Sequence, residues 1–192
     1  MIDTRFIIDD FVEMTESFET IDDDVIDWLR DNGFFVKPAA INHHGNYTGG
    51  LYEHSWNVTN ILLGFDLKWE RPESPYIVGM FHDVCKMDDY MDANFEKYGA
   101  VMMGTGDPIS DVPNWVKNPN ALKGHGDKSV MMLSTVMQLT EEEMYCIRYH
   151  MGAYRTEDWG EIDIIAKKYP NILYAHFADN LASKMEKVTD RV

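Results

Sequence analysis

One segment constrains this chain more than any other: a nearly unbroken apolar run at residues 75–87, which reads PYIVGMFHDVCKM. Only His82, Asp83 and Lys86 interrupt it. Pro75 suits the first turn of a helix, and a helix that is apolar on nearly every side is typical of a protein interior. A buried carboxylate is costly unless it is paired or bound to a metal. The sequence therefore predicts a central helix whose polar pair must find partners inside the protein.

Apolar residues at helical spacing predict further helices along the chain. One such stripe runs from Leu51 to Phe65 and includes His54 at a position expected to face the core. Thr140, with Glu143 three positions later, is typical of a capping box that opens a helix. The predicted helices cover residues 22–32, 51–66, 75–87, 125–139, 140–150, 161–168 and 171–187. This pattern predicts an all-α fold built as a helical bundle.

Residues 88–124 differ from the rest, because they contain three prolines, several glycines and asparagines, and little periodicity. We expect a less regular excursion here, with a short hairpin near 94–103, that covers a site. The length of 192 residues favours one domain over the whole chain. Residues 1–40 are expected to form an N-terminal helical extension of that domain.

The charge balance excludes some classes of partner. The chain has 17 Lys and Arg against 33 Asp and Glu, a net charge of −16. Binding to long nucleic acid or to anionic lipid requires a basic surface, so we expect neither, although a small anion could still bind in a local basic pocket. No uncharged apolar run approaches the roughly 18 residues of a membrane span. The N-terminal MIDTRFIIDD does not resemble a secretion signal, and two cysteines make no disulfide framework, so we expect a cytoplasmic protein.

Several ionisable residues sit at positions where a core residue is expected. His54 lies on an apolar stripe, His82 and Asp83 interrupt the most apolar helix, and Asp179 shares a face with Ile172 and Ala182. Taken singly, such a histidine is usually bonded to a carbonyl, and such an aspartate is usually an ion-pair or cap partner. A single metal centre would satisfy all of them together. Imidazole and carboxylate ligands without a set of thiolates suit iron, manganese, nickel, cobalt or zinc.

The order of these residues resembles a known pattern, the H…HD…H…H…D series of the HD-domain superfamily. The blocks that carry the resemblance are HHGNYTGGLYEHS at 43–55, FHDVCK at 81–86, GHGDKSV at 124–130, RYHMG at 148–152 and HFADNLAS at 176–183. The blocks occur in the expected order, and the resemblance spans about residues 41–185. They are similar to those of small bacterial and phage-type HD proteins, which are metal-dependent phosphohydrolases.

The resemblance implies a ligand set and a reaction. It implies one or two divalent transition metal ions, with Asp83 as the bridging ligand. The ligands assigned to one ion are His54, His82 and Asp179, and those assigned to the other are His125 and His150. A metal-bridging hydroxide would attack a phosphate monoester or diester of a nucleotide or short oligonucleotide. Such a small phosphorylated molecule is the expected partner.

Other residues are candidates for contacting the substrate. Lys86 lies on nearly the same helix face as the His82–Asp83 pair and could stabilise the phosphoryl group, although a lysine at a helix C-terminus is also favoured by the helix dipole. The candidate substrate-binding residues are His43, His44, Lys128 and Arg148, with Tyr154 a weaker one. For His43 and His44 the alternative is an ordinary polar loop. His176 is expected either in the core or as a residue that orients a ligand.

Two other functions are compatible with the same residues. Some HD relatives use this ligand set as a di-iron centre that activates oxygen, so a di-iron oxygenase is one alternative. The other is a non-catalytic HD module that binds a nucleotide or a partner protein. Six ionisable residues at costly positions favour an enzyme over a decayed site.

Overall fold

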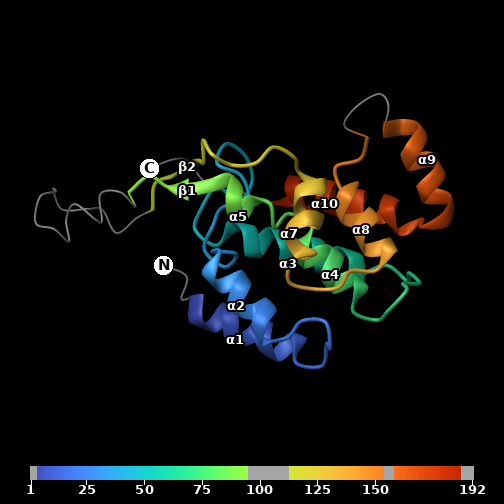
Figure 1. Cartoon of the computed structure of the whole chain (residues 1–192), viewed down its shortest axis with the longest axis horizontal. Helices are drawn as coiled ribbons and strands as arrows, with labels where there is room; N and C mark the ends of the chain where they lie inside the picture. Colours follow the sequence, from blue (N-terminus) through green and yellow to red (C-terminus); the bar gives the residue numbers. More distant parts are fainter. Residues whose placement is uncertain (1–3, 95–112, 154–157, 187–192) are drawn as a thin grey trace, which may run out of the picture.

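Helices account for nearly all of the regular structure in the computed structural model, which describes residues 4–94, 113–153 and 158–186 (Figure 1). The predicted all-α fold is therefore confirmed. The helices are α1 (Thr4–Thr15), α2 (Asp23–Asp31), α3 (Gly50–Leu63), α4 (Ser74–Phe81), α5 (Lys86–Asp89), α7 (Gly126–Leu133), α8 (Glu141–Arg148), α9 (Asp158–Lys168) and α10 (Asn171–Met185). None of the helices in the described ranges has the length and apolar character needed to cross a membrane.

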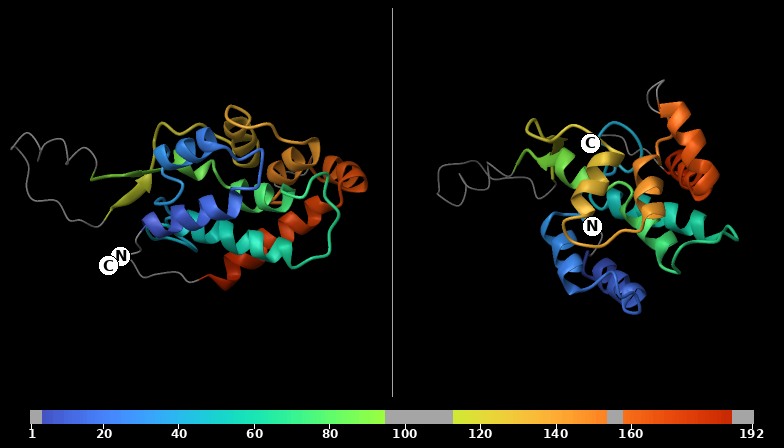
Figure 2. Two further views of the ribbon diagram at one scale, coloured as in Figure 1. Left: turned by 90° about the horizontal axis from the view of Figure 1, so that it is seen from below. Right: turned by 45° about the vertical axis from the view of Figure 1, so that its right-hand side comes forward.

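The centre of the molecule is built from α3, α4, α8 and α10. Helix α3 packs against both α4 and α10, and α8 packs against α4, α7 and α10. The views in Figure 2 show these helices side by side, with α9 at the outer edge of the group. Helices α3 and α4 approach closely at Gly79 of α4, where a Cβ atom would lie only 2.4 Å from Oγ1 of Thr59 on α3. A glycine is therefore needed for α4 to pack this close to α3.

The helix that contains the His–Asp pair is shorter than predicted. The sequence predicts one helix over 75–87, but α4 ends at Phe81 and His82 is its C-terminal cap. The backbone then tightens, because Val84 N–H donates to Phe81 O and Lys86 N–H donates to Asp83 O, each three residues back. Helix α5 begins only after this turn. His82 and Asp83 consequently lie in the turn that joins α4 to α5.

Other helix limits follow the prediction more closely. Asp22 caps α2 by accepting from Val25 N–H at 3.0 Å. The capping box of α8 has both of its bonds, Thr140 N–H to Glu143 Oε2 at 2.8 Å and Glu143 N–H to Thr140 Oγ1 at 3.2 Å. Helix α7 is the exception, since the predicted helix over 125–139 stops at Leu133 and continues as turns.

The excursion at 88–124 contains the strands of the fold. Strand β1 (Tyr90–Asp92) pairs antiparallel with β2 (Trp115–Lys117), and Met91 lies opposite Val116. The predicted hairpin near 94–103 falls almost wholly outside the described residues. The strands that are described lie on either side of it along the chain.

The N-terminal helices α1 and α2 attach to this centre through aromatic side chains. Phe11 of α1 is fully buried, and its ring centroid lies 5.5 Å from that of Phe35 in a tilted edge-on arrangement. Phe34, Tyr52 and Phe81 complete the cluster. The sequence predicts α2 but covers α1 only as part of a helical extension. Edge-on aromatic pairs add to the stabilisation from buried area, so this cluster anchors the extension.

Candidate metal centre

The structure brings the six residues of the ordered series together around Asp83. His54 comes from the middle of α3, His82 and Asp83 from the turn after α4, and Asp179 from α10. His125 precedes the first turn of α7, and His150 follows the end of α8. His54, His82 and His150 are each at most 1% exposed, and both aspartates are buried. Residues that are far apart in the sequence thus form one buried polar cluster.

The two oxygens of Asp83 face different histidines. Oδ1 lies 2.9 Å from His125 Nε2 and 3.5 Å from His150 Nε2. Oδ2 lies 3.7 Å from His82 Nε2 and 3.9 Å from His54 Nε2. On the side of His54, Asp179 Oδ1 is 3.1 Å from His54 Nε2 and 3.8 Å from His82 Nε2. The two oxygens of Asp83 therefore face the two groups of histidines that the resemblance assigns to different ions.

Backbone hydrogen bonds fix the orientation of two of the histidines. His82 donates from Nδ1 to the Gly79 carbonyl at 2.8 Å, and His150 donates from Nδ1 to the Ile147 carbonyl at 2.6 Å. In a neutral imidazole the other nitrogen, Nε2, then carries a lone pair, and in both residues it faces the cluster. A histidine that ligates a metal is usually held in this way through its second nitrogen.

Two buried atoms of the cluster have no hydrogen-bond partner among the described residues, namely Asp83 Oδ1 and His150 Nε2. Asp83 Oδ1 is close to His125 Nε2, but the contact lacks the geometry of a hydrogen bond. Lone pairs and carboxylate oxygens that converge without protons between them repel each other, and a cation removes this repulsion. His54, His82 and Asp83 offer donor atoms within 4.8 Å of one another, as do Asp83, Cys85 and His125. These buried groups fit a metal ion.

The cluster perturbs the pKa values of its own members. Burial lowers the pKa of His82 to about 4. Burial also opposes the charge on His54, but hydrogen bonds to Asp179 and Glu186 outweigh it and raise the pKa of His54 to about 10. Burial alone would raise the pKa of Asp179, but the hydrogen bond from His54 outweighs this effect and lowers the pKa to about 2. In the metal-free chain, His54 thus carries a proton that an ion would have to displace.

Glu186 also belongs to the cluster, although it is not part of the H…HD…H…H…D series. Its two carboxylate oxygens lie 3.0 and 3.1 Å from His54 Nδ1, and Asn57 donates to Oε1 at 3.0 Å. Glu186 is the C-terminal cap of α10 and lies seven positions after Asp179, which places both on one face of the helix. That spacing is the one signal in the sequence that could have indicated it.

Cys85 lies beside the ligand set. Its Sγ is 3.3 Å from His125 Nδ1, and Ser129 Oγ accepts from its backbone N–H at 3.2 Å. Burial raises the pKa of the Cys85 thiol, so the sulfur stays protonated in the metal-free chain. The thiol can therefore hydrogen-bond His125 and hold its ring toward Asp83.

A cavity of about 940 Å³ opens over the cluster. Lys86 is half-buried in its wall, and its ammonium helps to hold the pKa of Asp83 well below the usual range against the opposing effect of burial. His43 and His44 line the same cavity, and the His44 ring centroid is 4.7 Å from that of His54. His176 lines it too and donates from Nδ1 to the His150 carbonyl at 2.7 Å.

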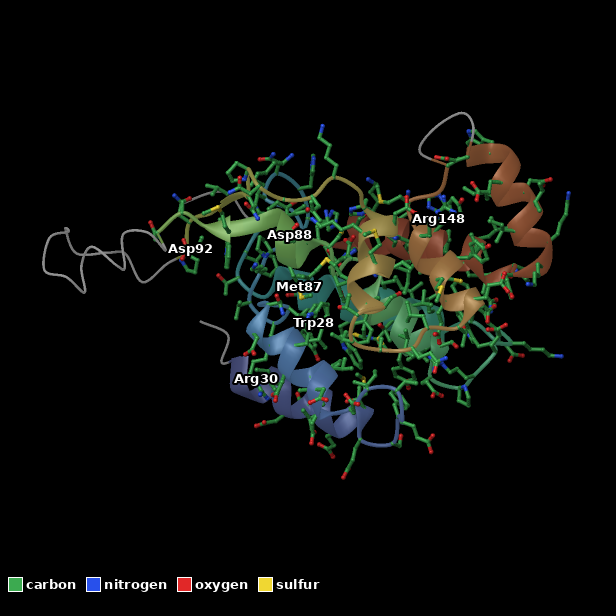
Figure 3. The ribbon with its side chains drawn as sticks, viewed as in Figure 1. Trp28, Arg30, Met87, Asp88, Asp92 and Arg148 are labelled. Atoms are coloured by element: carbon green, nitrogen blue, oxygen red, sulfur yellow. The ribbon has the colours of Figure 1, made fainter. Side chains whose placement is uncertain are left out.

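The two remaining substrate candidates occupy different environments. Arg148 lines the cavity from α8 (Figure 3), but it is also paired with Asp127 at 2.7 Å and Glu161 at 3.0 Å. Lys128 is buried and bonded to Asp88 and Asp89 at 2.6 Å each, and it does not line the cavity. Lys128 therefore does not lie where a substrate contact is expected, because Asp88 and Asp89 of α5 bind its ammonium and neutralise its charge. Tyr154 lies outside the described residues.

Comparisons of the chain with protein-family models, with curated proteins and with solved structures found no match. The helical fold and its buried His/Asp cluster are compatible with an HD-type fold.

Proposed function

We propose that this chain is an HD-type, metal-dependent phosphohydrolase that acts on a small phosphate ester such as a nucleotide. The observation that carries the proposal is the convergence of four histidines and two aspartates around Asp83 at the base of a cavity walled by Lys86. The order of these residues along the chain, which resembles the HD pattern, supports the same conclusion.

The residues divide into ligands and substrate contacts. His54, His82 and Asp179 would hold one divalent ion and His125 with His150 a second, with Asp83 shared between them. Bound ions would lower the pKa of a water molecule and offset negative charge on the phosphoryl oxygens. Lys86 would bind a phosphoryl oxygen, because its ammonium lies in the cavity wall and acts electrostatically on Asp83. His43 and His44 would contact the same group from the opposite loop.

The charge of the chain supports a small substrate. The net charge of −16 repels a long polyanion, whereas a cavity with lysine, arginine and histidine in its wall provides local positive charge for one phosphate. The volume of about 940 Å³ suits a ligand of nucleotide size.

The test is a hydrolysis assay on purified protein loaded separately with Mn²⁺, Fe²⁺, Co²⁺, Ni²⁺ or Zn²⁺. Substrates are p-nitrophenyl phosphate, bis(p-nitrophenyl) phosphate and a panel of nucleotides. We expect Lys86→Met to lower kcat/KM by about 10²–10³-fold with unchanged metal content, the size of effect seen when one transition-state donor is removed. Asp83→Asn should lose both activity and bound metal.

Lys167→Met is the matched control, since Lys167 is exposed on α9 and its one ion-pair partner among the described residues is the exposed Asp163. It should retain full activity. Failure of the metal-loaded wild type to hydrolyse any of these substrates would overturn the proposal. Nucleotide binding of equal strength in wild type and Asp83→Asn, without turnover, would favour a binding module instead.

A further inference from the structure

The α1–α2 hairpin carries most of the excess negative charge of the chain. Residues 1–31 contain eleven Asp and Glu but only two Arg, a net charge of −9 out of the total of −16. None of the acidic residues that the structure describes in this hairpin belongs to the ligand cluster or lines its cavity. Figures 1 and 2 show α1 and α2 together at one edge of the molecule, away from α9. This charge therefore needs an explanation separate from the proposed function.

A groove of about 670 Å³ runs along this hairpin, between α1, the connecting loop and α2. Ile21 and Ile26 in its lining are buried, Ile8 and Phe18 are half-buried, and Val12 is 36% exposed. The acidic residues of the lining are all exposed, and they are Asp9, Glu13, Glu16, Glu19, Asp22 and Asp23. The groove thus has an apolar floor and an acidic rim.

Most carboxylates of the acidic rim have no cationic or hydrogen-bond partner among the described residues. Asp22 caps α2, but among the described residues no hydrogen bond or ion pair engages the side chains of Asp9, Glu13, Glu16, Glu19 or Asp23. Arg30, at the end of α2 in Figure 3, also lines the groove but is paired with Asp27. Like charges held around an apolar surface repel one another, and cations on a partner would relieve that repulsion.

The groove is also anchored to the rest of the protein. Phe11 on the inner side of α1 packs into the aromatic cluster, while Phe18 beside the groove packs on Tyr76 with ring centroids 4.9 Å apart. A groove held in place from below need not be ordered when a partner binds, which lowers the entropic cost of association.

We infer that this groove binds a basic amphipathic helix of a partner protein. An apolar stripe at positions i, i+3, i+4 and i+7 would lie on Val12 and Phe18, and flanking Lys or Arg would pair with the rim. A second copy of this chain is a poor occupant, because it would bring the same net charge of −16. The metal cavity stays open, since the groove and the cavity share no lining residue.

The test measures binding of a fluorescent helical peptide by anisotropy, using the full chain. The peptide carries leucine at i, i+3, i+4 and i+7 and lysine elsewhere, and a second peptide has the same composition in scrambled order. We expect the amphipathic peptide to bind about tenfold more tightly than the scrambled one, because only the former presents leucines to the floor. The double variant Glu13→Lys/Glu16→Lys should bind the amphipathic peptide about ten times more weakly than the wild type does.

The matched control is Asp66→Lys with Asp163→Lys, which changes the net charge equally at exposed sites outside the groove. It should retain the wild-type affinity. Equal binding of the two peptides, or equal weakening by the two double variants, would overturn the inference and indicate diffuse charge attraction. Val12→Ser gives an independent check, because it removes an apolar contact with the peptide at an exposed position and leaves the charge unchanged. It should weaken binding of the amphipathic peptide and leave binding of the scrambled peptide unchanged. Circular dichroism and metal content establish that each variant is folded.

Discussion

His54 is held through both of its ring nitrogens, and both partners lie on one helix. Asp179 and Glu186 contact opposite sides of the imidazole from the middle and the end of α10. The ring orientation therefore depends on α10 staying docked on α3. A carboxylate behind a metal-binding histidine also raises the basicity of the imidazole, so Glu186 would act through His54 on the affinity for a bound ion.

Replacing Glu186 should weaken metal binding without removing a ligand. We expect Glu186→Ala to lower the affinity for Co²⁺ by about 10–100-fold, the range typical of such outer carboxylates. Glu186→Gln keeps an acceptor for His54 and should recover part of the loss. Competition with a chromophoric chelator measures both, with Glu19→Ala, at an exposed site on the hairpin loop, as the control. Wild-type affinity in Glu186→Ala would mean that His54 does not bind the ion.

At the scale of the elements, the contact between α3 and α4 determines where the cluster forms. Gly79 permits the close approach to Thr59, and its carbonyl accepts the hydrogen bond from His82. One residue thus sets both the separation of the two helices and the orientation of a candidate ligand. In the turn after Phe81, Asp83 lies against His125, which precedes α7, and His150, which follows α8.

Adding a methyl group at this contact should be costly. We expect Gly79→Ala to lower the free energy of unfolding by about 1–3 kcal/mol, because Thr59 must move to accommodate the new atom. Gly160→Ala on α9 is the matched control, since a Cβ there would meet no described atom within 4 Å. It should gain about 0.5–1 kcal/mol from helix propensity. Denaturant unfolding compares the two variants. Equal free energies of unfolding would show that the α3–α4 contact can accommodate an extra methyl group.

At the scale of the whole molecule, the buried ligand cluster lies where α3, α4, α8 and α10 pack together. Without an ion, the proton on His54 offsets the charges of the Asp179 and Glu186 carboxylates. The pKa of His54 rises from 6.5 to about 10 on folding, so this proton stabilises the fold fully below pH 6.5, and the stabilisation is lost as pH rises toward 10. A bound ion would take the place of this proton, so the metal-bound protein would not lose this stabilisation as pH rises from 6.5 toward 10.

Metal stabilisation should therefore grow with pH. Below pH 10, displacement of the His54 proton makes metal affinity rise about tenfold per pH unit. By mass action this adds about 1.4 kcal/mol, or about 3–5 °C in Tm, per unit. Thermal unfolding with and without Co²⁺ at about pH 6 and pH 8 measures the effect, and a chelator should restore the metal-free Tm. A metal-induced shift that does not change with pH would contradict the assigned proton.

Local patterns in the sequence predict much of this architecture. The all-α fold, the helix that begins near Asp22 and the capping box at Thr140–Glu143 depend on residues a few positions apart, so the sequence alone indicates them. His54, His82, Asp83 and Asp179 were recognisable because a polar residue on an apolar face conflicts with its neighbours in the sequence. The sequence by itself thus determined the helices and the ionisable residues that the core must accommodate.

Only the tertiary structure decided which of these groups meet. The end of α4 at Phe81, the bond from His54 to Glu186 and the ion pairs of Lys128 with Asp88 and Asp89 all depend on long-range packing. Lys128 and Lys86 look alike in sequence, each three residues after a candidate ligand, yet one is neutralised by α5 and the other faces the cavity. Periodicity fixes the face of a helix on which a side chain lies. The partner it contacts is fixed by how the helices cross, and that is set by close contacts such as the one between Gly79 and Thr59.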